Sequence, residues 1–588
     1  MDSSSLTQFV QQMRLDVDAL PDAHVRQVVG QVLNLVEEVI QENRRLREEN
    51  ESLREILRKA HVKPPPKPPA SGAANPATAT DTPAATSGSR SSEKERRARE
   101  GRKPPHADRR SFRPIHVDRD VHCPVDHVLL PTDATFIGYD DVVVQDLIIH
   151  TDNIRYRCEI WFSPTQGRFC SSLPPGVHGQ YGSRLRTLLV SLKYVAGTSL
   201  PRAQALVEHF GIVISPASVV NILHDAAEPL KAEKEAIFRA GLAATTYQHV
   251  DDTSARVGGE FWHTHLIGSP LHASYFTRAN KDRLTVLDLL RGGPRTYRFD
   301  ALTQRLLEQL HVPKKWRRRA AQLPQDRDLS EEELTQRLES WPPPPAAYLA
   351  DLREAAAIAS YRARPDHVRL LVGDDAKQFR HLADEFQLCW IHEGRHYQSL
   401  SPVVPCHQQQ CAQFRRRYWD FYGELQTYRQ SPTTAEAERL RGKFDEVFGT
   451  RTGYDALDRR IAKTRRKKPT LLTVLDHPEV PLHNNPAELD ARVAARRRDV
   501  SLHCRNAAGG EEMDTFTTIV QTAKKLAVNG YEYLYDRISG LFRMPSLASL
   551  IGERAKTRAP LQPTPPNQLA TPPPAPSTIP NSPCAAIV

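Results

Sequence analysis

The sequence predicts an α/β protein made of several domains, and three observations support this prediction. Three short strand-like runs, at 246–253, 260–267 and 271–276, are joined by turns that contain Gly or Pro. A helical run at 282–290 and then a short apolar run at 368–372, typical of a buried strand, follow them. A heptad pattern lies near the N-terminus. The 588 residues are enough for about three or four domains with a sizeable core.

The composition suggests a chain that is folded only in part. Hydrophobic residues make up 39% of it and Pro contributes 46 residues. A net charge of +10 suits a polyanionic partner but does not demonstrate one. The eight cysteines are scattered, and there is no secretory signal and no apolar run near the roughly 20 residues that span a bilayer. We therefore expect a cytoplasmic, nucleoid-associated protein.

Residues 1–60 are predicted to form an N-terminal helical coiled coil, because a heptad runs from about 25 to 58. β-Branched residues at position a with Leu at d favour two strands, and Asn at a specifies register and dimer. The alternative is an amphipathic helix that docks on its own chain. The heptad residues are Val29, Val36, Asn43, Asn50 and Leu57 at a, and Val32, Val39, Leu46 and Leu53 at d.

Two segments have a composition that cannot build a core. Residues 61–115 are rich in Pro, Ala, Ser and Thr and end in a basic run, which predicts a disordered basic linker. Residues 541–588 are predicted to be a Pro-rich disordered tail.

Residues 116–175 look like a zinc ribbon that has lost ligands. Tetrahedral zinc takes four ligands, usually two from each of two knuckles. Asp126 and Trp161 stand where the second Cys of each knuckle is expected, although His122 or Cys170 could substitute. We therefore expect a degenerate zinc-ribbon-like β module and no secure zinc site.

Residues 176–240 have the pattern of a helix-turn-helix and are predicted to be a helical DNA-binding segment. Gly211 lies at the turn, Ser215 is placed to cap the second helix, and Pro216 takes its first position. The alternative is an ordinary helical hairpin, because the second helix is poor in Arg and Lys.

Carboxylates stand at three distant places further along the chain. Asp251-Asp252 belongs to the first strand-like run, and Asp374-Asp375 follows the buried strand. Glu488 follows an Asn-Asn-Pro turn at the start of a helix. A strand meander, a helix, a buried strand with a terminal Asp and then an acidic helix is the order of an RNase H-like domain.

We therefore predict an RNase H-like catalytic domain over residues 241–540, closed by a last helical segment at about 515–534. A long helical and charged region separates the second acidic pair from the third acid, which predicts a helical insertion at about 390–480. Such a site binds two hard cations through oxygen ligands. The cations generate the nucleophile and stabilise both oxygens of an in-line displacement at phosphorus.

Each acid also has a structural explanation. Successive strand residues face opposite sides of a sheet, so only one of Asp251 and Asp252 can face the site. The Asp374-Asp375 pair could cap a following helix. For Glu488, the pattern predicts a capping-box-like arrangement with Asn485 as the N-cap, Pro486 at N1 and Glu488 at N3.

A basic face is predicted beyond the third acid. Arg492 and Arg496 lie four and eight residues after Glu488, on the same side of its helix. With Arg497 and Arg498 they form a patch that could hold DNA phosphates near the metals. The alternative is a solvated basic helix.

Four short motifs and their order give the chain a family resemblance. They are Val250-Asp251-Asp252-Thr253, Val372-Gly373-Asp374-Asp375, Cys389-Trp390-Ile391-His392 and Asn484-Asn485-Pro486-Ala487-Glu488. With them the chain resembles transposases of the insertion sequence 66 family, DDE-type enzymes with an RNase H-like fold. The likeness extends from the ribbon remnant to about residue 536, and the N-terminal coiled coil is also typical of that family.

The resemblance implies a set of roles. Asp251, Asp374 and Glu488 would be the first, second and third acids, with Mg²⁺ as the cofactor, two ions being expected. Element-end DNA would be the substrate, and hydrolysis would expose a 3′-hydroxyl that attacks target DNA. Companion proteins of the same element and a homodimer or higher oligomer are further implied partners.

Two departures from the family pattern bear on function. The zinc knuckles are degraded, which puts metal-dependent end recognition in doubt, and Leu489 follows the third acid where the family usually has Arg. The alternative function is therefore a catalytically inactive, transposase-derived dimer that binds DNA without cutting it. Asp252 and Asp375 remain alternatives to Asp251 and Asp374 at the first two positions.

Overall fold

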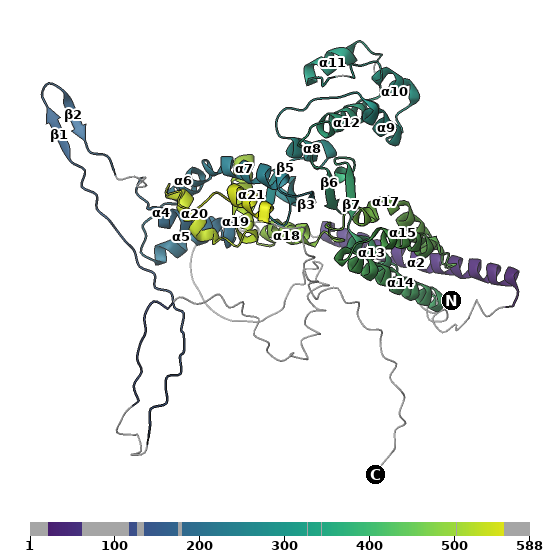
Figure 1. The fold of residues 1–588 in the computed structure, drawn as a ribbon, viewed down its shortest axis with the longest axis horizontal. Coiled ribbons are helices and arrows are strands. Elements are labelled where there is room, and N and C mark those ends of the chain that lie inside the picture. Colours follow the sequence, from purple (N-terminus) through teal and green to yellow (C-terminus); the bar gives the residue numbers. More distant parts are fainter. Residues whose placement is uncertain are drawn as a thin grey trace. The chain divides into compact units, whose positions relative to one another are not determined.

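The structure is a computed structural model that describes residues 21–61, 117–125, 134–173, 179–325, 327–342, 344–500 and 503–557. It divides into two compact units, one of residues 1–50 and 151–588 and the other of residues 51–150 (Figure 1). Almost all of the linker predicted at 61–115 falls outside the described residues. None of the helices that the structure describes is long and apolar enough to cross a membrane.

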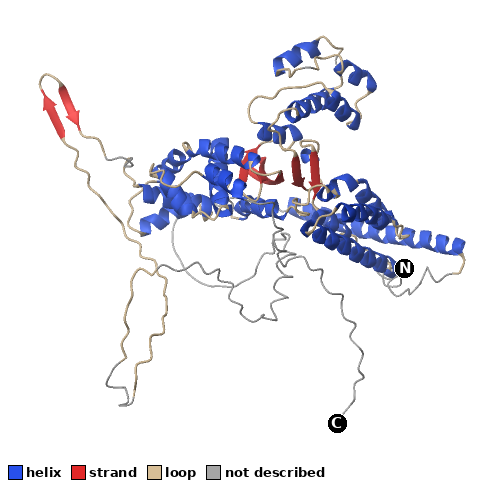
Figure 2. Cartoon of the chain, in the orientation of Figure 1, coloured by secondary structure: helices blue, strands red, loops and turns tan. Residues whose placement is uncertain are grey.

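The larger unit contains a five-stranded mixed sheet, drawn in red with its surrounding helices in blue in Figure 2. Its spatial order is β5-β4-β3-β6-β7. Strands β3, β4 and β5 form the predicted antiparallel meander, and β6 and β7 continue the sheet in parallel with β3. The α/β prediction is therefore confirmed. The bounds are β3 Tyr247–Val257, β4 Glu260–Gly268, β5 Ala273–Arg278, β6 Leu370–Gly373 and β7 Glu385–Leu388.

Helix α19 (Ala507–Lys525) covers the free edge of β5. Three of its side chains, one helical turn apart, accept hydrogen bonds from alternate backbone N–H groups of the strand. Four helical residues rise about 6 Å, close to the roughly 6.7 Å spanned by two strand residues, so the two repeats match. The pairs are Thr522 with Ala273 at 3.2 Å, Thr518 with Tyr275 at 3.1 Å, and Asp514 with Thr277 at 2.5 Å.

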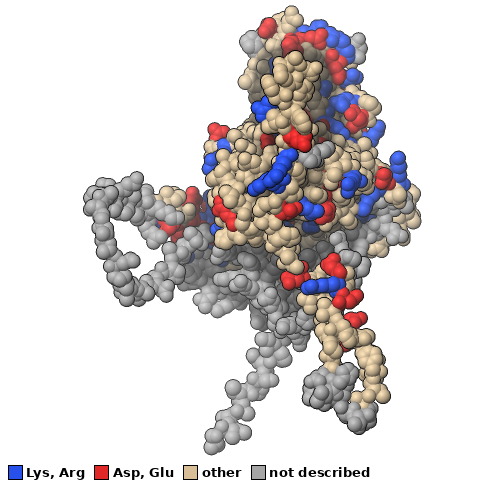
Figure 3. Space-filling model, turned by 90° about the vertical axis from the view of Figure 1, so that its left-hand side faces the viewer, with Lys and Arg blue, Asp and Glu red and all other residues tan. Residues whose placement is uncertain are grey.

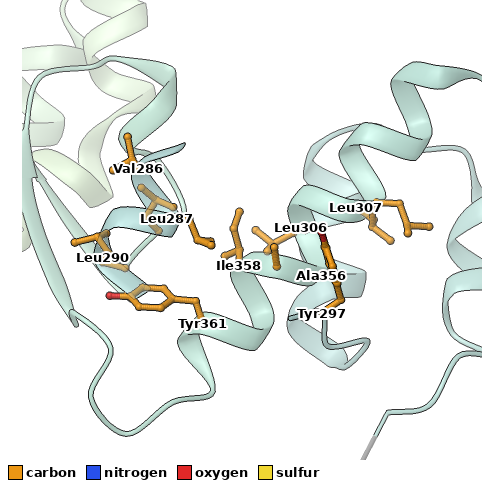
Figure 4. Close-up of a cluster of buried hydrophobic side chains, with 14 of the residues drawn as sticks. Val286, Leu287, Leu290, Tyr297, Leu306, Leu307, Ala356, Ile358 and Tyr361 are labelled. Atoms are coloured by element: carbon orange, nitrogen blue, oxygen red, sulfur yellow. The ribbon is translucent and has the colours of Figure 1, made fainter. Parts of the chain in front are cut away.

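A first helical unit separates β5 from β6, and it begins with the helix predicted after residue 282. Its core combines aliphatic side chains with Tyr297 and Tyr361, and Figure 4 shows Leu306 of one helix near Ala356 and Ile358 of another. The helices are α8 Arg283–Arg291, α9 Ala301–Gln309, α10 Lys314–Ala320, α11 Glu331–Glu339 and α12 Ala346–Arg362.

A second helical unit follows β7, in the range predicted as the insertion, and it has an aromatic core of its own. Trp390 is fully buried there, with ring centroids 5.6 Å from those of both Tyr418 and Phe421. The helices are α13 Trp390–Gln398, α14 Pro405–Gln430, α15 Thr434–Gly449, α16 Asp455–Arg466 and α17 Lys468–Leu471.

The helix-turn-helix pattern forms as predicted. The turn carries Gly211 at a positive φ of 85°, Ser215 caps the second helix by accepting from the Ser218 N–H, and Pro216 is its first residue. That second helix buries an apolar face that includes Val219 and Leu223. The helices are α4 Ser183–Val190, α5 Leu200–His209, α6 Pro216–Ala227 and α7 Leu230–Ala243.

The C-terminal boundary was predicted too early. The helix expected at about 515–534 is two helices, α19 and α20 (Gly530–Ile538), with Ala527 at a positive φ of 53° between them. Helix α21 (Leu547–Thr557) then lies inside the segment predicted as disordered from residue 541. It folds because Leu547 and Ile551 are fully buried against the helices of the helix-turn-helix region. Residues 558–588 of the predicted tail fall outside the described residues.

The N-terminal helix α2 (Ala23–His61) docks on the second helical unit over part of its length. Leu33 and Ile40 are buried against Val403 and Val404. Of the heptad residues, Val29 and Val36 border this contact, whereas the d residues Val32, Val39, Leu46 and Leu53 are exposed. The first part of α2 therefore docks on its own chain, as the alternative interpretation expected. The d residues remain exposed, so pairing of α2 into a coiled coil stays a prediction.

The predicted ribbon module contains one hairpin among its described residues. Strands β1 (Ile160–Ser163) and β2 (Gly167–Cys170) pair with Trp161 opposite Phe169. Cys123, Cys158 and Cys170 are exposed, and none belongs to a group of metal-ligating side chains found within the described part of the chain.

Candidate active site

The first two acids lie on neighbouring parallel strands. β3 and β6 pair through Tyr247 to His249, with His249 opposite Val372 as the last pair. Asp251 and Asp374 each come two residues after this pair. Neighbouring strands lie about 4.8 Å apart, so this register brings the two acids to adjacent places at one edge of the strand pair.

Asn484 joins the start of the third-acid helix, α18 (Asn485–Asp499), to the sheet. Its side-chain N–H donates to the Val250 carbonyl at 2.9 Å, and its side-chain oxygen accepts from His249 Nδ1 at 2.8 Å. Its backbone N–H donates to Cys389 Sγ at 3.3 Å. The helix carrying Glu488 is therefore fixed to β3 beside Asp251.

The predicted cap of α18 is wrong by one residue. The Glu488 N–H donates to the Asn484 carbonyl at 3.0 Å, which makes Asn484 the N-cap and places Glu488 at N4 rather than N3. The Glu488 carboxylate instead faces side chains of α13. The capping-box explanation of this glutamate therefore does not hold.

Asp374 and Glu488 lie close enough to Asp251 for their charges to act on it. Burial, together with the negative charges of Asp374, Asp252 and Glu488, raises the pKa of Asp251 to about 7, against the Asp252 N–H that donates to it. Burial also raises the pKa of Asp374. Because neighbouring carboxylates repel one another and neither Asp251 nor Asp374 has an ion pair within the described residues, a bound cation would stabilise both charges.

Asp252 and Asp375, the residues next to Asp251 and Asp374, differ from them because each forms at least one ion pair with a basic side chain. Asp252 pairs with Lys281 at 3.1 Å and accepts a short hydrogen bond from Gln378. Asp375 pairs with Lys467 at 2.6 Å and with Arg380.

These cations change the direction in which the pKa of Asp375 is shifted. Burial alone would raise its pKa, but Lys467 and Arg380 outweigh burial and lower it. The acids adjacent to Asp251 and Asp374 are thus neutralised, whereas Asp251 and Asp374 are not.

Glu488 has an unusual set of neighbours. Its side chain is 14% exposed, with Oε2 3.4 Å from Arg395 and Oε1 3.5 Å from His392 Nδ1. His392 Nδ1 and Glu488 Oε1 are within ion-pair range, yet neither of these two atoms makes a hydrogen bond within the described residues. Ligand atoms of Cys389, His392 and Glu488 all lie within 4.8 Å of one another.

The predicted arginines fall into different environments. Arg492 and Arg496 are exposed on α18. Arg497 is half-buried and points to α19, where it donates to Thr517, and burial lowers its pKa. It is therefore a packing residue and not part of a phosphate patch. The side chain of Arg498 lies outside what the structure describes.

Among the described residues, the face shown in Figure 3 has no uniformly basic surface that would indicate a DNA-binding site. Lys and Arg are interspersed there with Asp and Glu.

Several residues of the site carried no predicted role. Cys389 and His392 stood in a family motif, and a Cys and a His three residues apart at the start of a helix was the signal available for them. His249 and Asn484 could not be linked before the fold placed them together, because they are 235 residues apart.

The site fits a hard divalent cation. It offers carboxylate oxygens, the donor type that Mg²⁺ prefers. Glu488 Oε1 is buried without a hydrogen-bond partner among the described residues, and burial, with the neighbouring carboxylates, raises the pKa of Asp251. Asp251, Asp374 and Glu488 are the residues that could hold such an ion.

Comparison with known proteins gives two matches. A model of the transposase IS66 family matches residues 178–265 and 355–512, which include the three acids and leave out β5 and helices α8 to α11. An uncharacterised protein of Sinorhizobium fredii, y4jO, is 32% identical over 330 residues, covering 54% of this chain and 100% of its own length. No solved structure matches.

Proposed function

We propose that this chain, which belongs to the IS66 family of transposases, cuts DNA strands at the ends of its element and joins them to target DNA. The observation that carries this proposal is the shared electrostatic environment of Asp251, Asp374 and Glu488. The charges of acids from distant parts of the chain act on one another here, and although Arg395 contacts Glu488, neither Asp251 nor Asp374 has an ion pair within the described residues. That is the arrangement a metal-dependent polynucleotidyl transferase requires.

The sheet supports an RNase H-like core. An antiparallel meander is extended on the side of its first strand by two parallel strands. Asp251 lies within the first strand, Asp374 follows its parallel neighbour, and Glu488 comes from a helix packed on β3 and β4. These are the three positions expected for the acids of a DDE enzyme.

Each residue of the site would have a defined task. When bound, two Mg²⁺ ions on Asp251, Asp374 and Glu488 would activate a nucleophile and stabilise charge on the attacking and leaving oxygens. Asn484 holds the start of α18 on β3, so the Glu488 carboxylate is delivered by a rigid element. The cation partners of Asp252 and Asp375 keep these two acids out of the site.

The proposed chemistry has two displacements at phosphorus. In the first, water forms a bond to the phosphorus at the element end while the bond to the 3′-oxygen breaks, which leaves a 3′-hydroxyl and a 5′-phosphate. In the second, this hydroxyl attacks a target phosphodiester and releases a target 3′-hydroxyl. The DNA would lie over α18, where Arg492 and Arg496 are exposed beyond the third acid.

Oligomerisation is part of the proposal. The exposed d residues of α2 would pair with a second copy, giving a homodimer, and companion proteins of the element could join it. Sedimentation equilibrium of Leu46→Glu, Leu53→Glu protein should show loss of the dimer. Persistence of the dimer would refute pairing through α2.

Nicking of element-end DNA tests the activity. Full-length protein is incubated with a labelled element-end duplex and Mg²⁺, beside Asp251→Asn, Asp374→Asn and Glu488→Gln variants. We expect nicking by the parent and a loss of at least about 100-fold in each variant, because each removes a ligand charge. Asp375→Asn is the matched control and should retain most activity, since Asp375 already pairs with two cations.

The opposite result would favour the second candidate. DNA binding without nicking by the parent, with or without companion proteins, would indicate a transposase-derived DNA-binding dimer. The exposed, unclustered cysteines of the ribbon remnant are the observation that keeps this candidate open.

A further inference from the structure

Glu488 meets two donors that come from a single turn of α13. Arg395 contacts Oε2 at 3.4 Å and His392 Nδ1 lies 3.5 Å from Oε1. The two residues are three apart, so they lie on one face of the helix. Both oxygens of the third acid are therefore covered from the same side.

The hydrogen bond between these two residues fixes the state of the histidine. Arg395 NH1 lies 2.9 Å from His392 Nε2. A guanidinium can only donate, so Nε2 must accept, and the ring proton of neutral His392 then sits on Nδ1. That nitrogen lies 3.5 Å from Glu488 Oε1, within ion-pair range but outside hydrogen-bond geometry.

Helix α13 is itself tied to the two elements that carry the other acids. The Cys389 N–H donates to the Gly373 carbonyl at 2.9 Å, immediately before Asp374, and the Trp390 N–H donates to the Leu482 carbonyl at 2.9 Å. Cys389 Sγ also accepts from the N-cap of α18. The donors facing Glu488 are therefore fixed relative to both strand and helix of the site.

We propose that His392 and Arg395 are positioning residues that hold the Glu488 carboxylate in register with Asp251 and Asp374, with His392 in its Nδ1–H form. This inference rests on the proposed function. The pair keeps the carboxylate oriented in the absence of metal and leaves its oxygens able to turn toward a cation when one binds.

Cys389, His392 and Glu488, whose ligand atoms lie within 4.8 Å of one another, could instead form a transition-metal site. The hydrogen bond from Arg395 argues against that reading. It occupies the Nε2 lone pair and leaves Nδ1 protonated, so neither nitrogen can bind a metal without breaking the contact. The Cys389 thiol also accepts a backbone hydrogen bond, and burial raises its pKa to about 11.

The test compares full-length His392→Leu, His392→Asn and His396→Leu proteins. His396 is exposed on the same helix and serves as the matched control. Binding of Mn²⁺, followed by electron paramagnetic resonance, is the first readout, and nicking at saturating DNA is the second.

We expect His392→Leu to weaken Mn²⁺ binding and nicking by roughly 10- to 100-fold. The amide N–H of His392→Asn should restore most of both, and DNA affinity should not change. Because Mn²⁺ binding is measured separately, a parent protein that fails to nick would count against the proposed function and leave this test intact.

Three outcomes would overturn the proposal. Mn²⁺ binding by His392→Leu equal to that of the parent would show that the histidine does not position the acid. A folded His392→Asn protein no better than His392→Leu would show that the N–H is not what matters. Co²⁺ binding with a thiolate charge-transfer band that Cys389→Ala abolishes would establish the transition-metal site instead.

Discussion

Asp251 shows how the fold turns an ordinary strand residue into a reactive group. Its carboxylate is half-buried, and its pKa is raised to about 7 by burial and by Asp374 and Glu488. Asp252, the next residue, faces Lys281 and Gln378 instead. The alternation of side chains along the strand thus separates a proposed metal ligand from a neutralised acid.

The raised pKa of Asp251 gives a pH-dependent stability. The folded state holds its proton more tightly than the unfolded state, so between about pH 4 and pH 7 folding loses stability as the pH rises. Metal-free Asp251→Asn protein should therefore be more stable than the parent at pH 8, by about 1 to 3 kcal/mol, and the gain should shrink toward pH 5. Urea unfolding in EDTA at both pH values measures this.

Asp252→Asn is the control for that experiment. It removes the partner of Lys281 and should bring no gain at pH 8. A destabilised Asp251→Asn protein at pH 8 would show that Asp251 is not strained by its neighbours.

At the scale of single residues, the sequence could propose which acids form the site but could not reveal the side chains that surround them. The order of the motifs indicated Asp251, Asp374 and Glu488. The partners that distinguish Asp251 from Asp252 come from residues 29 and 126 positions away, which no local pattern reveals. Arg497 was misread for the same reason, because helical spacing shows a side of α18 but not that α19 covers it.

The elements were predicted where their signals are local. The strands of the meander, the turn and cap of the helix-turn-helix and the helix after residue 282 all formed as expected. The errors lie where tertiary contacts decide. Helix α21 folds because Leu547 and Ile551 are buried in a core, and α18 begins directly after Asn484, the residue that bonds to β3.

Glu37 anchors helix α2 to the second helical unit, a contact that the heptad pattern did not predict. It is almost fully buried and accepts hydrogen bonds from the Val403 and Val404 N–H groups at 2.7 and 2.8 Å. It thereby ties α2 to the segment that leads into α14, with His407 Nδ1 3.3 Å away. Burial alone would raise its pKa, but His407 and the two N–H groups outweigh it and lower the pKa.

Replacing Glu37 should release α2 from the second helical unit. Glu37→Ala leaves buried donors without an acceptor, which costs about 3 kcal/mol and should speed hydrogen exchange of the α2 amides near residues 29–40 by roughly 100-fold. Because the folded pKa is lowered, this stabilisation is present at neutral pH and is lost only as the pH falls below about 4.5.

Glu38→Ala is the matched control for that exchange measurement. Glu38 is exposed on the same helix and its replacement should leave exchange unchanged. Equal exchange in the two variants would mean that Glu37 does not anchor α2.

On the scale of the whole molecule, the site is assembled from segments more than a hundred residues apart. β3 and β6 bring Asp251 and Asp374 together, and Asn484 fixes α18 with Glu488 against β3. The second helical unit separates the second acid from the third in sequence, yet its first helix supplies the donors that face Glu488. The insertion is therefore part of the site rather than an appendage to it.

Crystals of the full-length protein soaked in Mn²⁺ test the convergence of the three acids most directly. Anomalous scattering should place Mn²⁺ within about 2.5 Å of carboxylate oxygens of Asp251, Asp374 and Glu488. An Asp374→Asn crystal should lose that signal. Mn²⁺ bound by Asp252 and Asp375, or three acids too far apart to share an ion, would contradict the proposed active site.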